Sequence, residues 1–310
     1  MSILVIGATF MDIKGFPNDT YIPTGRNAGR VEYIHGGVAR NVVEDIANAE
    51  LRPTFLSIVD DTPMGAAVVQ KLRNHKVNTQ YILTRPDGMG TWLAVFDKTG
   101  DVAGSISKRP NLLPLLELLN QRGDEIFSKV SSVVLEVDID KVIVKKVFEL
   151  VKKHGLKIFA LVSNMSIALE RRDFLMGFDC FICNQQEAGM LFLDDYSGKT
   201  REEMVEILAE KVSQAEIPAM VVTMGADGAV YADLTGRKGI CPARNVQVKD
   251  TTGAGDAFCA GVAIGLTYGK ELPDAIEIGS MLAASVITSS ENVCPRFQPA
   301  ELGLDVEIDS

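Results

Sequence analysis

Small residues and two acids gather at positions 250–258, in the string DTTGAGDAF. An apolar pattern begins within this string and predicts a helix over Ala254 to Tyr268. The backbone N–H groups of Gly253, Ala254 and Gly255 would then lie at the positive end of the helix dipole, where the helix itself offers them no acceptor. A helix end of this kind can bind an anion, phosphate included.

An acid at this point would repel a phosphate, so Asp256 needs a chemical explanation. A carboxylate beside an anion site can take the proton from an attacking hydroxyl, which makes the string a candidate phosphoryl-transfer centre. Glycines before a helix also form tight turns, and a first-turn acid also complements the dipole, so a bare GxGD pattern has two explanations. The hydroxyls of Thr251 and Thr252 and the small residues that follow favour the chemical one.

Two other phosphate-binding motifs do not fit this chain. A Walker-type loop needs a Lys and a Ser or Thr directly after its last glycine, whereas Gly255 is followed by Asp256 and Ala257. The first strand ends at Gly7 and continues as ATFMD, without the glycine pattern of a dinucleotide-binding fold.

Polar residues elsewhere suit a polyol and a metal ion. Asp12 and Asn41 offer acceptors and donors for neighbouring hydroxyls, while Gly36 and Gly37 let the backbone approach a sugar ring. Glu187 is a hard oxygen ligand suited to Mg²⁺, which keeps several waters and bridges phosphate oxygens.

Each motif also has a simpler explanation when taken alone. Asn184 would suit the start of a helix, Glu187 a solvated helix face, and the stretch from Gly225 to Gly228 a hairpin turn.

Together, and in this order, the motifs resemble the signature of the PfkB, or ribokinase-like, carbohydrate kinases along nearly the whole chain. The matching elements are Asp12; GGVARN with Gly36, Gly37 and Asn41; NQQE with Asn184 and Glu187; TMGADG with Thr223, Gly225 and Gly228; and DTTGAGDAF with Gly253, Ala254, Gly255 and Asp256. The resemblance implies an α/β fold, a ribokinase-like three-layer sandwich with a mostly parallel central sheet and a small β-sheet lid. It also implies an ATP-dependent kinase that phosphorylates a primary hydroxyl of a sugar or nucleoside.

The resemblance implies a role for each matched residue. Asp12 would hold sugar hydroxyls together with the GGVARN residues, Asp256 would be the catalytic base, and TMGADG would lie beside the nucleotide. Glu187 would organise Mg²⁺ through water. Asp250 and Thr252 match positions that bind K⁺ in several relatives, although a helix-capping Asp explains Asp250 equally well.

Within the family, the stretches GRNAGRVEYIHGGVARN (25–41) and SSEN (289–292) resemble those of pseudouridine kinases, which makes pseudouridine the expected acceptor. At three places on the acceptor side, the sequence departs from the pattern usual in pseudouridine kinases. Phe10 replaces a usual Asn, Ser107 and Lys108 stand where an Asn and an Asp are usual, and ALVSNMS (160–166) lacks a usual Asp and Pro.

Two alternatives therefore remain open. The acceptor is a free sugar, a sugar phosphate or another nucleoside, and basic residues such as Arg30, Arg40, Lys108 and Arg109 would serve a phosphate. Alternatively, the protein is a sugar or nucleoside sensor that keeps a kinase fold, against which the intact Asp256 argues.

Composition points to an enzyme of the cytoplasm rather than a nucleic-acid or membrane protein. The 310 residues are 46% hydrophobic, and 31 basic against 41 acidic residues give a net charge of −10, which disfavours a nucleic-acid partner. No stretch approaches the roughly 20 apolar residues of a spanning helix. Five cysteines without a dense framework suit a reducing compartment, and the CxxC of Cys180 and Cys183 lies in an apolar, strand-like run that suits core packing.

Strand and helix patterns alternate along the chain and predict a parallel sheet covered by helices on both faces. The expected strands are Ile3 to Ile6, Thr54 to Val59, Ser132 to Val137, Lys157 to Val162, Cys180 to Cys183 and Met220 to Thr223. The expected helices besides the one after Gly253 are Ala39 to Ala49, Met64 to Asn74, Lys141 to His154 and Arg201 to Gln214.

Two segments, about 12–35 and 90–107, break this alternation and look like short strands joined by turns. We expect them to form a separate small sheet inserted into a single domain over residues 1–310. In the resembled family such a sheet is a lid that excludes water and often a dimer contact, so a homodimer through the lid is expected.

Overall fold

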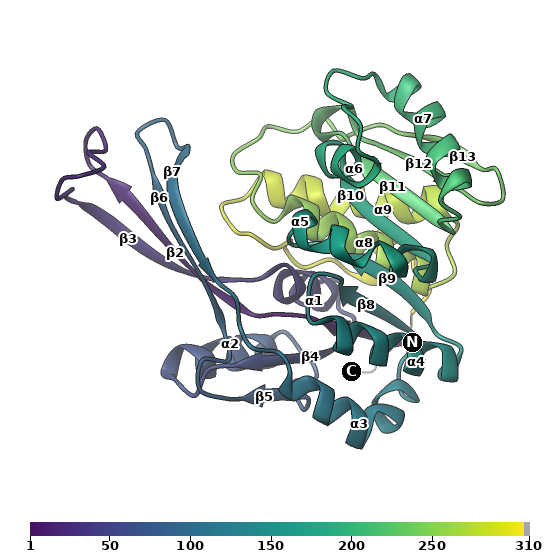
Figure 1. Cartoon of the computed structure of the whole chain (residues 1–310), viewed down its shortest axis with the longest axis horizontal. Coiled ribbons are helices and arrows are strands. Elements are labelled where there is room, and N and C mark those ends of the chain that lie inside the picture. Colours follow the sequence, from purple (N-terminus) through teal and green to yellow (C-terminus); the bar gives the residue numbers. More distant parts are fainter. Residues whose placement is uncertain (307–310) are drawn as a thin grey trace.

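A computed structural model describes residues 1–306 of the protein, with Arg171 and Arg172 described by their backbone alone. Nine strands of this part of the chain form the large sheet (Figure 1). They are β1 (Ile3–Ile6), β4 (Thr54–Val59), β5 (Ile82–Thr84), β8 (Ser132–Glu136), β9 (Lys157–Leu161), β10 (Cys180–Asn184), β11 (Ala219–Thr223), β12 (Ala229–Asp233) and β13 (Lys238–Cys241). Their order is β13-β12-β11-β10-β9-β8-β1-β4-β5, and only β12 and β13 pair antiparallel with their neighbours.

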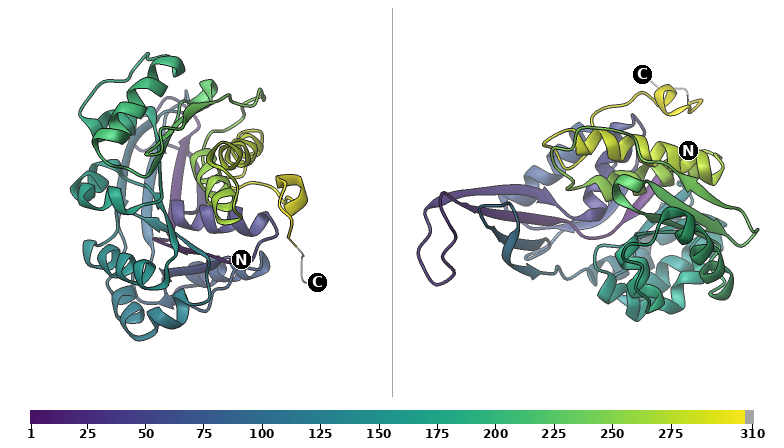
Figure 2. Two further views of the ribbon diagram at one scale, coloured as in Figure 1. Left: turned by 90° about the vertical axis from the view of Figure 1, so that its right-hand side faces the viewer. Right: turned by 90° about the horizontal axis from the view of Figure 1, so that it is seen from above.

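Helices cover both faces of this sheet, so the molecule has three layers (Figure 2). One face carries α1 (Val38–Asn48), α2 (Pro63–Asn74), α8 (Ala254–Thr267) and α9 (Leu272–Ile287). The other carries α3 (Pro114–Phe127), α4 (Lys141–His154), α5 (Met165–Ala168), α6 (Gln185–Phe192) and α7 (Arg201–Gln214). Short 3₁₀ turns occupy Leu169–Gly177, Gly225–Asp227 and Pro299–Leu302.

Successive side chains of each strand point alternately into two separate hydrophobic cores, one on each face of the sheet. In β1, Leu4 and Ile6 belong to one hydrophobic core, while Ile3 and Val5 belong to the other. Successive side chains of a strand point to opposite faces, so a strand covered on both faces is apolar throughout. The predicted α/β layering is confirmed.

The two lid segments form a separate four-stranded sheet, as predicted. Its strands are β2 (Phe10–Pro17), β3 (Gly29–Gly36), β6 (Gly90–Phe96) and β7 (Val102–Lys108), in the order β3-β2-β6-β7. This sheet, called the lid below, projects from the body of the molecule (Figures 1 and 2). None of these four strands joins the large sheet.

The carboxyl ends of the parallel strands meet at one edge of the large sheet, which is where ligands of such folds collect. Ser163 follows β9, Asn184 ends β10, and Gly225 follows β11 by one residue. Helix α8 begins at the same side because Gly253 adopts φ +83°, a left-handed conformation that suits glycine.

Several smaller predictions are also met. The predicted helix Arg201–Gln214 is present as α7, and Thr200 and Glu203 form a capping box at its start. Cys180 and Cys183 are free, buried and divided between the two cores, as expected for core residues. None of the helices described is both long and apolar enough to cross a membrane.

Candidate active site

A cavity of about 300 Å³, called the lid cavity, lies between the lid and the start of α8. Four lid residues line it, namely Phe10, Asp12, Trp92 and Ser107, and the remaining lining comes from Gly37, Val38, Asn41, Arg109, Ser163, Asn164, Thr252, Gly253, Asp256 and Asn292. The ladder pairs Asp12 with Trp92 and Trp92 with Ser107, so three of the lid residues form one row across adjacent strands. The lid cavity therefore brings together predicted residues from both ends of the chain.

Asp256 is half-buried at the floor of this cavity, in the first turn of α8. The Asn41 amide donates from Nδ2 to Asp256 Oδ2 at 2.7 Å, across 215 residues of sequence. Asn41 Oδ1 in turn accepts from Nδ2 of Asn292 at 3.3 Å, and the same nitrogen donates to the carbonyl of His35 at 3.1 Å. This chain of hydrogen bonds orients the carboxyl group and leaves its other oxygen without a partner among the described residues.

The surroundings of Asp256 change its acidity in a useful direction. Burial raises the pKa of the Asp256 carboxyl to about 7, against the opposing effects of the Asn41 hydrogen bond and the Arg40 charge, while Asp12 adds to the increase. A carboxylate with a pKa near neutrality is a better proton acceptor than an ordinary aspartate and is still largely ionised at slightly alkaline pH. The group is suited to act as a general base.

The Asp12 carboxyl lies beside a glycine of the neighbouring lid strand. A Cβ at Gly36 would lie 2.5 Å from the Asp12 carboxyl atoms, so glycine is needed there to make room for the acid. Gly37 adopts φ +98°, and a Cβ on it would approach the Ala8 carbonyl to 2.8 Å. Burial also raises the pKa of Asp12, against the opposing charges of Lys14 and Arg40. The structure thus explains the glycine pair by the room that the Asp12 carboxyl and the backbone need. The sequence suggests a different reason, the close approach of a sugar ring.

The N-terminus of α8 offers fewer free amides than the sequence suggests. The Ala254 N–H donates to the carbonyl of Thr251 at 3.2 Å. Within residues 1–306, we find no hydrogen bond from the N–H groups of Gly253, Gly255 or Asp256. A Cβ at Gly255 would meet nothing within 4 Å, so space is open in front of this turn.

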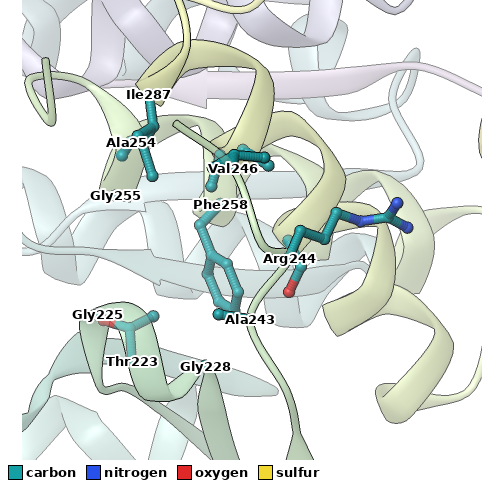
Figure 3. Close-up of a pocket in the computed structure, with 13 residues that line it drawn as sticks. Thr223, Gly225, Gly228, Ala243, Arg244, Val246, Ala254, Gly255, Phe258 and Ile287 are labelled. Carbon is teal, nitrogen blue, oxygen red and sulfur yellow. The ribbon is translucent and has the colours of Figure 1, made fainter. Parts of the chain in front are cut away.

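A second cavity of about 160 Å³, called the α8–α9 cavity, begins on the other side of the same helix end. Figure 3 shows the Phe258 ring between the turn of Thr223, Gly225 and Gly228 and the chain at Ala243. Its lining is mostly apolar and includes Ala254 and Gly255, whereas Gly253 and Asp256 line the lid cavity. The two cavities therefore meet at the first turn of α8.

Asn184 and Glu187 lie at the start of α6 and bond to each other's backbone. Asn184 Oδ1 accepts from the Glu187 N–H, and Glu187 Oε2 accepts from the Asn184 N–H, both at 2.8 Å. The pair forms a capping box, so the helix-start explanation of Asn184 holds whatever else the pair does. Burial raises the pKa of Glu187, and the charge of Asp138 adds to this.

Asp250 and Thr252 form a tight local turn just before α8. Asp250 Oδ1 accepts from the Thr252 N–H at 2.8 Å, which is the capping arrangement considered for this acid. Both residues are exposed, and Thr252 lines the lid cavity. The geometry does not require a cation here, so the K⁺ site stays a prediction.

Sequence comparison identifies the family to which this site belongs. The pfkB family carbohydrate kinase profile matches residues 1–294. The chain belongs to the PfkB family of carbohydrate kinases. It is therefore a phosphotransferase with an alcohol group as acceptor, and PfkB kinases use ATP, generally with Mg²⁺.

Individual PfkB relatives differ in the acceptor that their names give. Guanosine-inosine kinase of Exiguobacterium acetylicum is 34% identical over 292 residues, which cover 94% of this chain and 95% of that enzyme. Pseudouridine kinase of Escherichia coli (strain K12) is 25% identical over 264 residues, which cover 84% and 82%. The solved structure of Arabidopsis thaliana ribokinase complexed with ribose and ATP superposes with a TM-score of 0.84 at 19% identity over 97% of each chain, which confirms the ribokinase-like fold.

The residues around Glu187 fit a PfkB magnesium site of the water-mediated kind. Glu187 Oε1 has no hydrogen-bond partner among the described residues, and the nearby Asp138 adds negative potential. No group of three or more His, Cys, Asp or Glu side chains in residues 1–306 could hold a metal by itself. Such a site suits Mg²⁺, which is bound through one or two carboxylates, waters and substrate phosphates.

Sequence reasoning gave no role to several residues that line the lid cavity. Asn292 completes the hydrogen-bond chain to Asp256, and its only signal was the SSEN resemblance. Phe10 and Ser107 appeared only as departures from a subfamily pattern, and Arg109 only as one of several basic residues. Trp92 gave no signal, because its role depends on its place in the lid ladder.

Proposed function

We propose that this protein is an ATP-dependent nucleoside kinase that transfers the γ-phosphoryl group to the primary hydroxyl of the ribose, with guanosine and inosine as its acceptors. The guanosine-inosine kinase that matches 94% of the chain at 34% identity supports this acceptor class. Phe10 and Trp92 support it too, because two aromatic side chains in the lid cavity offer flat surfaces for a nucleobase.

One observation carries the proposal: two cavities open onto the same helix end. A phosphoryl donor in the α8–α9 cavity and an acceptor in the lid cavity would have their reacting ends at Gly253–Asp256. Phosphoryl transfer depends mainly on such positioning and on stabilisation of charge, because the protein has little covalent chemistry to perform.

Each predicted site residue has a place in this scheme. Asp12 and Asn41 bind ribose hydroxyls, and Asp256, held by Asn41, accepts the proton of the attacking hydroxyl. The free N–H groups at Gly253 and Gly255 stabilise the charge of the moving phosphoryl group. On the nucleotide side, Thr223, Gly225 and Gly228 line the donor cavity with Ala254.

Two further ions belong to the proposal. Glu187, with Asn184 shaping its turn, would hold Mg²⁺ through water, and the metal supplies charge neutralisation on the polyphosphate. Asp250 and Thr252 would bind K⁺ beside the helix end, in which case replacing KCl by NaCl lowers the rate at constant ionic strength.

Pseudouridine is the second candidate acceptor. The GGVARN stretch and the 25% identity to pseudouridine kinase favour it. A uracil ring could also stack on these aromatic side chains, so a direct comparison of kcat/KM decides the acceptor.

The lid supports a proposed homodimer. The ladder aligns Tyr33, Ile13, Leu93 and Ile106 in one row across the four strands. The adjacent row contains Asp12 and Trp92, which face the cavity, so the first row faces away from it. Tyr33, Leu93 and Ile106 are 58%, 41% and 70% exposed, an apolar face that a second copy of the lid would cover.

The test is a coupled assay of ADP formation with guanosine, inosine, pseudouridine, uridine, adenosine, ribose and sugar phosphates. Asp256→Asn should lower kcat by about 10²- to 10⁴-fold, because the amide cannot accept the proton, while calorimetry shows acceptor binding within a few-fold of wild type. Retained turnover would exclude Asp256 as the base. Nucleoside binding without ATP consumption in the wild type would favour the sensor instead.

A further inference from the structure

A buried arginine of α1 lies next to the lid cavity without lining it. Arg40 precedes Asn41, the residue that holds Asp256, and the Arg40 side chain is only 1% exposed. It is not among the residues that line the cavity, so it does not reach a substrate phosphate. Its guanidinium can act on the site only through other groups of the protein.

The ion pairs around Arg40 leave a surplus of positive charge. Arg40 Nη1 donates to Glu44 Oε2, one helical turn along α1, and Lys71 Nζ of α2 lies 2.8 Å from Oε1 of the same acid. Burial raises the pKa of Glu44, but the charges of Arg40 and Lys71 outweigh it and hold this pKa below its usual value. His75 lies 3.9 Å from the same acid, and burial lowers its pKa, so it adds no charge at neutral pH. One ionised acid therefore faces two cations.

The stability of the fold does not account for this buried pair. Two apolar side chains of similar size are often as stable as a buried ion pair, because both charges lose their hydration. Arg40 Nε is also buried and has no hydrogen-bond partner among the described residues, which costs further free energy. A role in the active site gives a reason for a cation at this position.

Hydrogen bonds connect Arg40 to Asp256. Arg40 Nη2 donates to the carbonyl oxygen of His35, and Asn292 Nδ2 donates to the same oxygen at 3.1 Å. Asn292 also donates to Asn41, which in turn donates to Asp256. Arg40 thus helps to fix the carbonyl group that orients the amide side chains leading to Asp256.

The charge of Arg40 also offsets a concentration of acids at this place. Burial raises the pKa of Asp256 to about 7, with Arg40 acting against the increase and Asp12 adding to it. Burial likewise raises the pKa of Asp12, and the charges of Lys14 and Arg40 oppose this. Neighbouring carboxylates raise one another's pKa, so a nearby cation is needed if both are to be ionised. The remaining titratable groups that interact with Asp256 supply no cation; they are Asp45 and Cys259.

We propose that Arg40 is a positioning residue for the catalytic base, because it fixes the amide chain that leads to Asp256 and supplies the buried counter-charge for Asp256 and Asp12. Glu44 holds the guanidinium in this place. This inference rests on the proposed function, in which Asp256 is the base. Arg40 itself touches neither the acceptor nor the phosphoryl donor.

The pH dependence of kcat/KM for guanosine tests this role. The reaction needs an ionised Asp256, so wild-type kcat/KM should fall below pH 7, and this fall is the acid limb of the profile. Arg40→Met removes the charge at similar volume and should move the acid limb up by about one pH unit, the low end of the range for a nearby opposite charge. The loss should then be about tenfold at pH 6 and small at pH 9, where Asp256 is ionised in both proteins.

Three further variants separate charge from packing. Arg40→Lys keeps the positive charge and should keep the acid limb close to its wild-type position. Glu44→Gln removes the acid of the same buried pair and leaves Arg40 charged, so it should not move the limb upward. Arg201→Met, at an exposed ion pair with Glu202 at the start of α7, is the control and should match the wild type at every pH.

A structural role for Arg40 predicts different results. An equal loss at pH 6 and pH 9 in Arg40→Met overturns the inference, and so does an upward shift of the same size in Arg40→Lys or Glu44→Gln. If thermal unfolding shows that Arg40→Met does not fold, the double variant Arg40→Met/Glu44→Gln removes both buried charges. Its acid limb should still lie above that of the wild type, because Arg40 is the member of the pair that acts on Asp256, and an unchanged limb overturns the inference.

Failure of this inference differs from failure of the proposed function. An active Arg40→Met protein with an unmoved acid limb overturns the role of Arg40 and leaves the kinase proposal intact. A wild type that phosphorylates no nucleoside overturns the proposed function and this inference together.

Discussion

At the scale of single residues, Asp256 is the proposed base, and its sequence context singled it out. A GxGD turn followed by an apolar helix predicts both the anion site and the base. The sequence could not show that the Ala254 amide donates to Thr251, because that depends on the exact turn that precedes the helix. It also could not place Asn292 beside Asn41, since the two residues are 251 positions apart.

The pKa of Asp256 predicts how the reaction rate depends on pH. The base must be ionised, and burial raises its pKa to about 7, so kcat/KM should fall about tenfold per pH unit below that value and level off above it. Asn41 lowers this pKa through its hydrogen bond, so Asn41→Ala should move the acid limb to higher pH. The measurement is kcat/KM against pH for both proteins.

Asn74→Ala, on the exposed end of α2, is the control and should keep the wild-type profile. An acid limb near pH 4 in the wild type would contradict the environment described for Asp256, and an unchanged limb in Asn41→Ala would contradict the role of its hydrogen bond.

At the scale of elements, the sequence predicted those with strong periodic patterns. Strands β1 and β4 and helices α4 and α7 lie at the expected positions. The helix Pro114–Phe127 was not predicted, nor was the antiparallel pair Ala229–Asp233 and Lys238–Cys241. The two strands are short and extend the sheet beyond β11, and tertiary contacts decide such an edge more than local sequence does.

Glycine placement in the lid allows an element-scale prediction. Gly36→Ala would put a methyl group 2.5 Å from the Asp12 carboxyl, so the acid has to move. We expect the acceptor KM to rise by about tenfold or more, in line with loss of a hydrogen bond to a charged group, while the ATP KM changes little. Steady-state kinetics with each substrate varied in turn measures this.

Gly104→Ala is the matched control, because a Cβ at this position in β7 meets nothing within 4 Å. It should leave both KM values near wild type. Equal effects of the two substitutions would show that lid flexibility, rather than the position of Asp12, controls acceptor binding.

At the scale of the whole molecule, the lid is a separate sheet that projects from the body. The sequence predicted a separate sheet because two β-rich segments interrupt the strand–helix alternation. It could not show which side chains face outward, because that depends on the pairing register.

The outward row gives the prediction at this scale. Ile106→Lys should convert a dimer to a monomer, because it places a charge on the apolar face that the second copy would cover. Val142→Lys is the control: Val142 is 47% exposed on α4, away from the lid, and its substitution should not change the mass. Light scattering after size exclusion gives the mass, and a monomeric wild type would exclude the lid dimer.

The two cavities draw on different parts of the chain, and this division has an evolutionary consequence. Most of the lid cavity comes from residues 10–164, and the α8–α9 cavity comes entirely from residues 223–287, with the start of α8 common to both. If the two cavities bind acceptor and donor as proposed, mutations within residues 10–164 can alter acceptor choice without disturbing the donor cavity. Gene duplicates of such a kinase can diversify their substrates while inheriting an intact ATP-handling module.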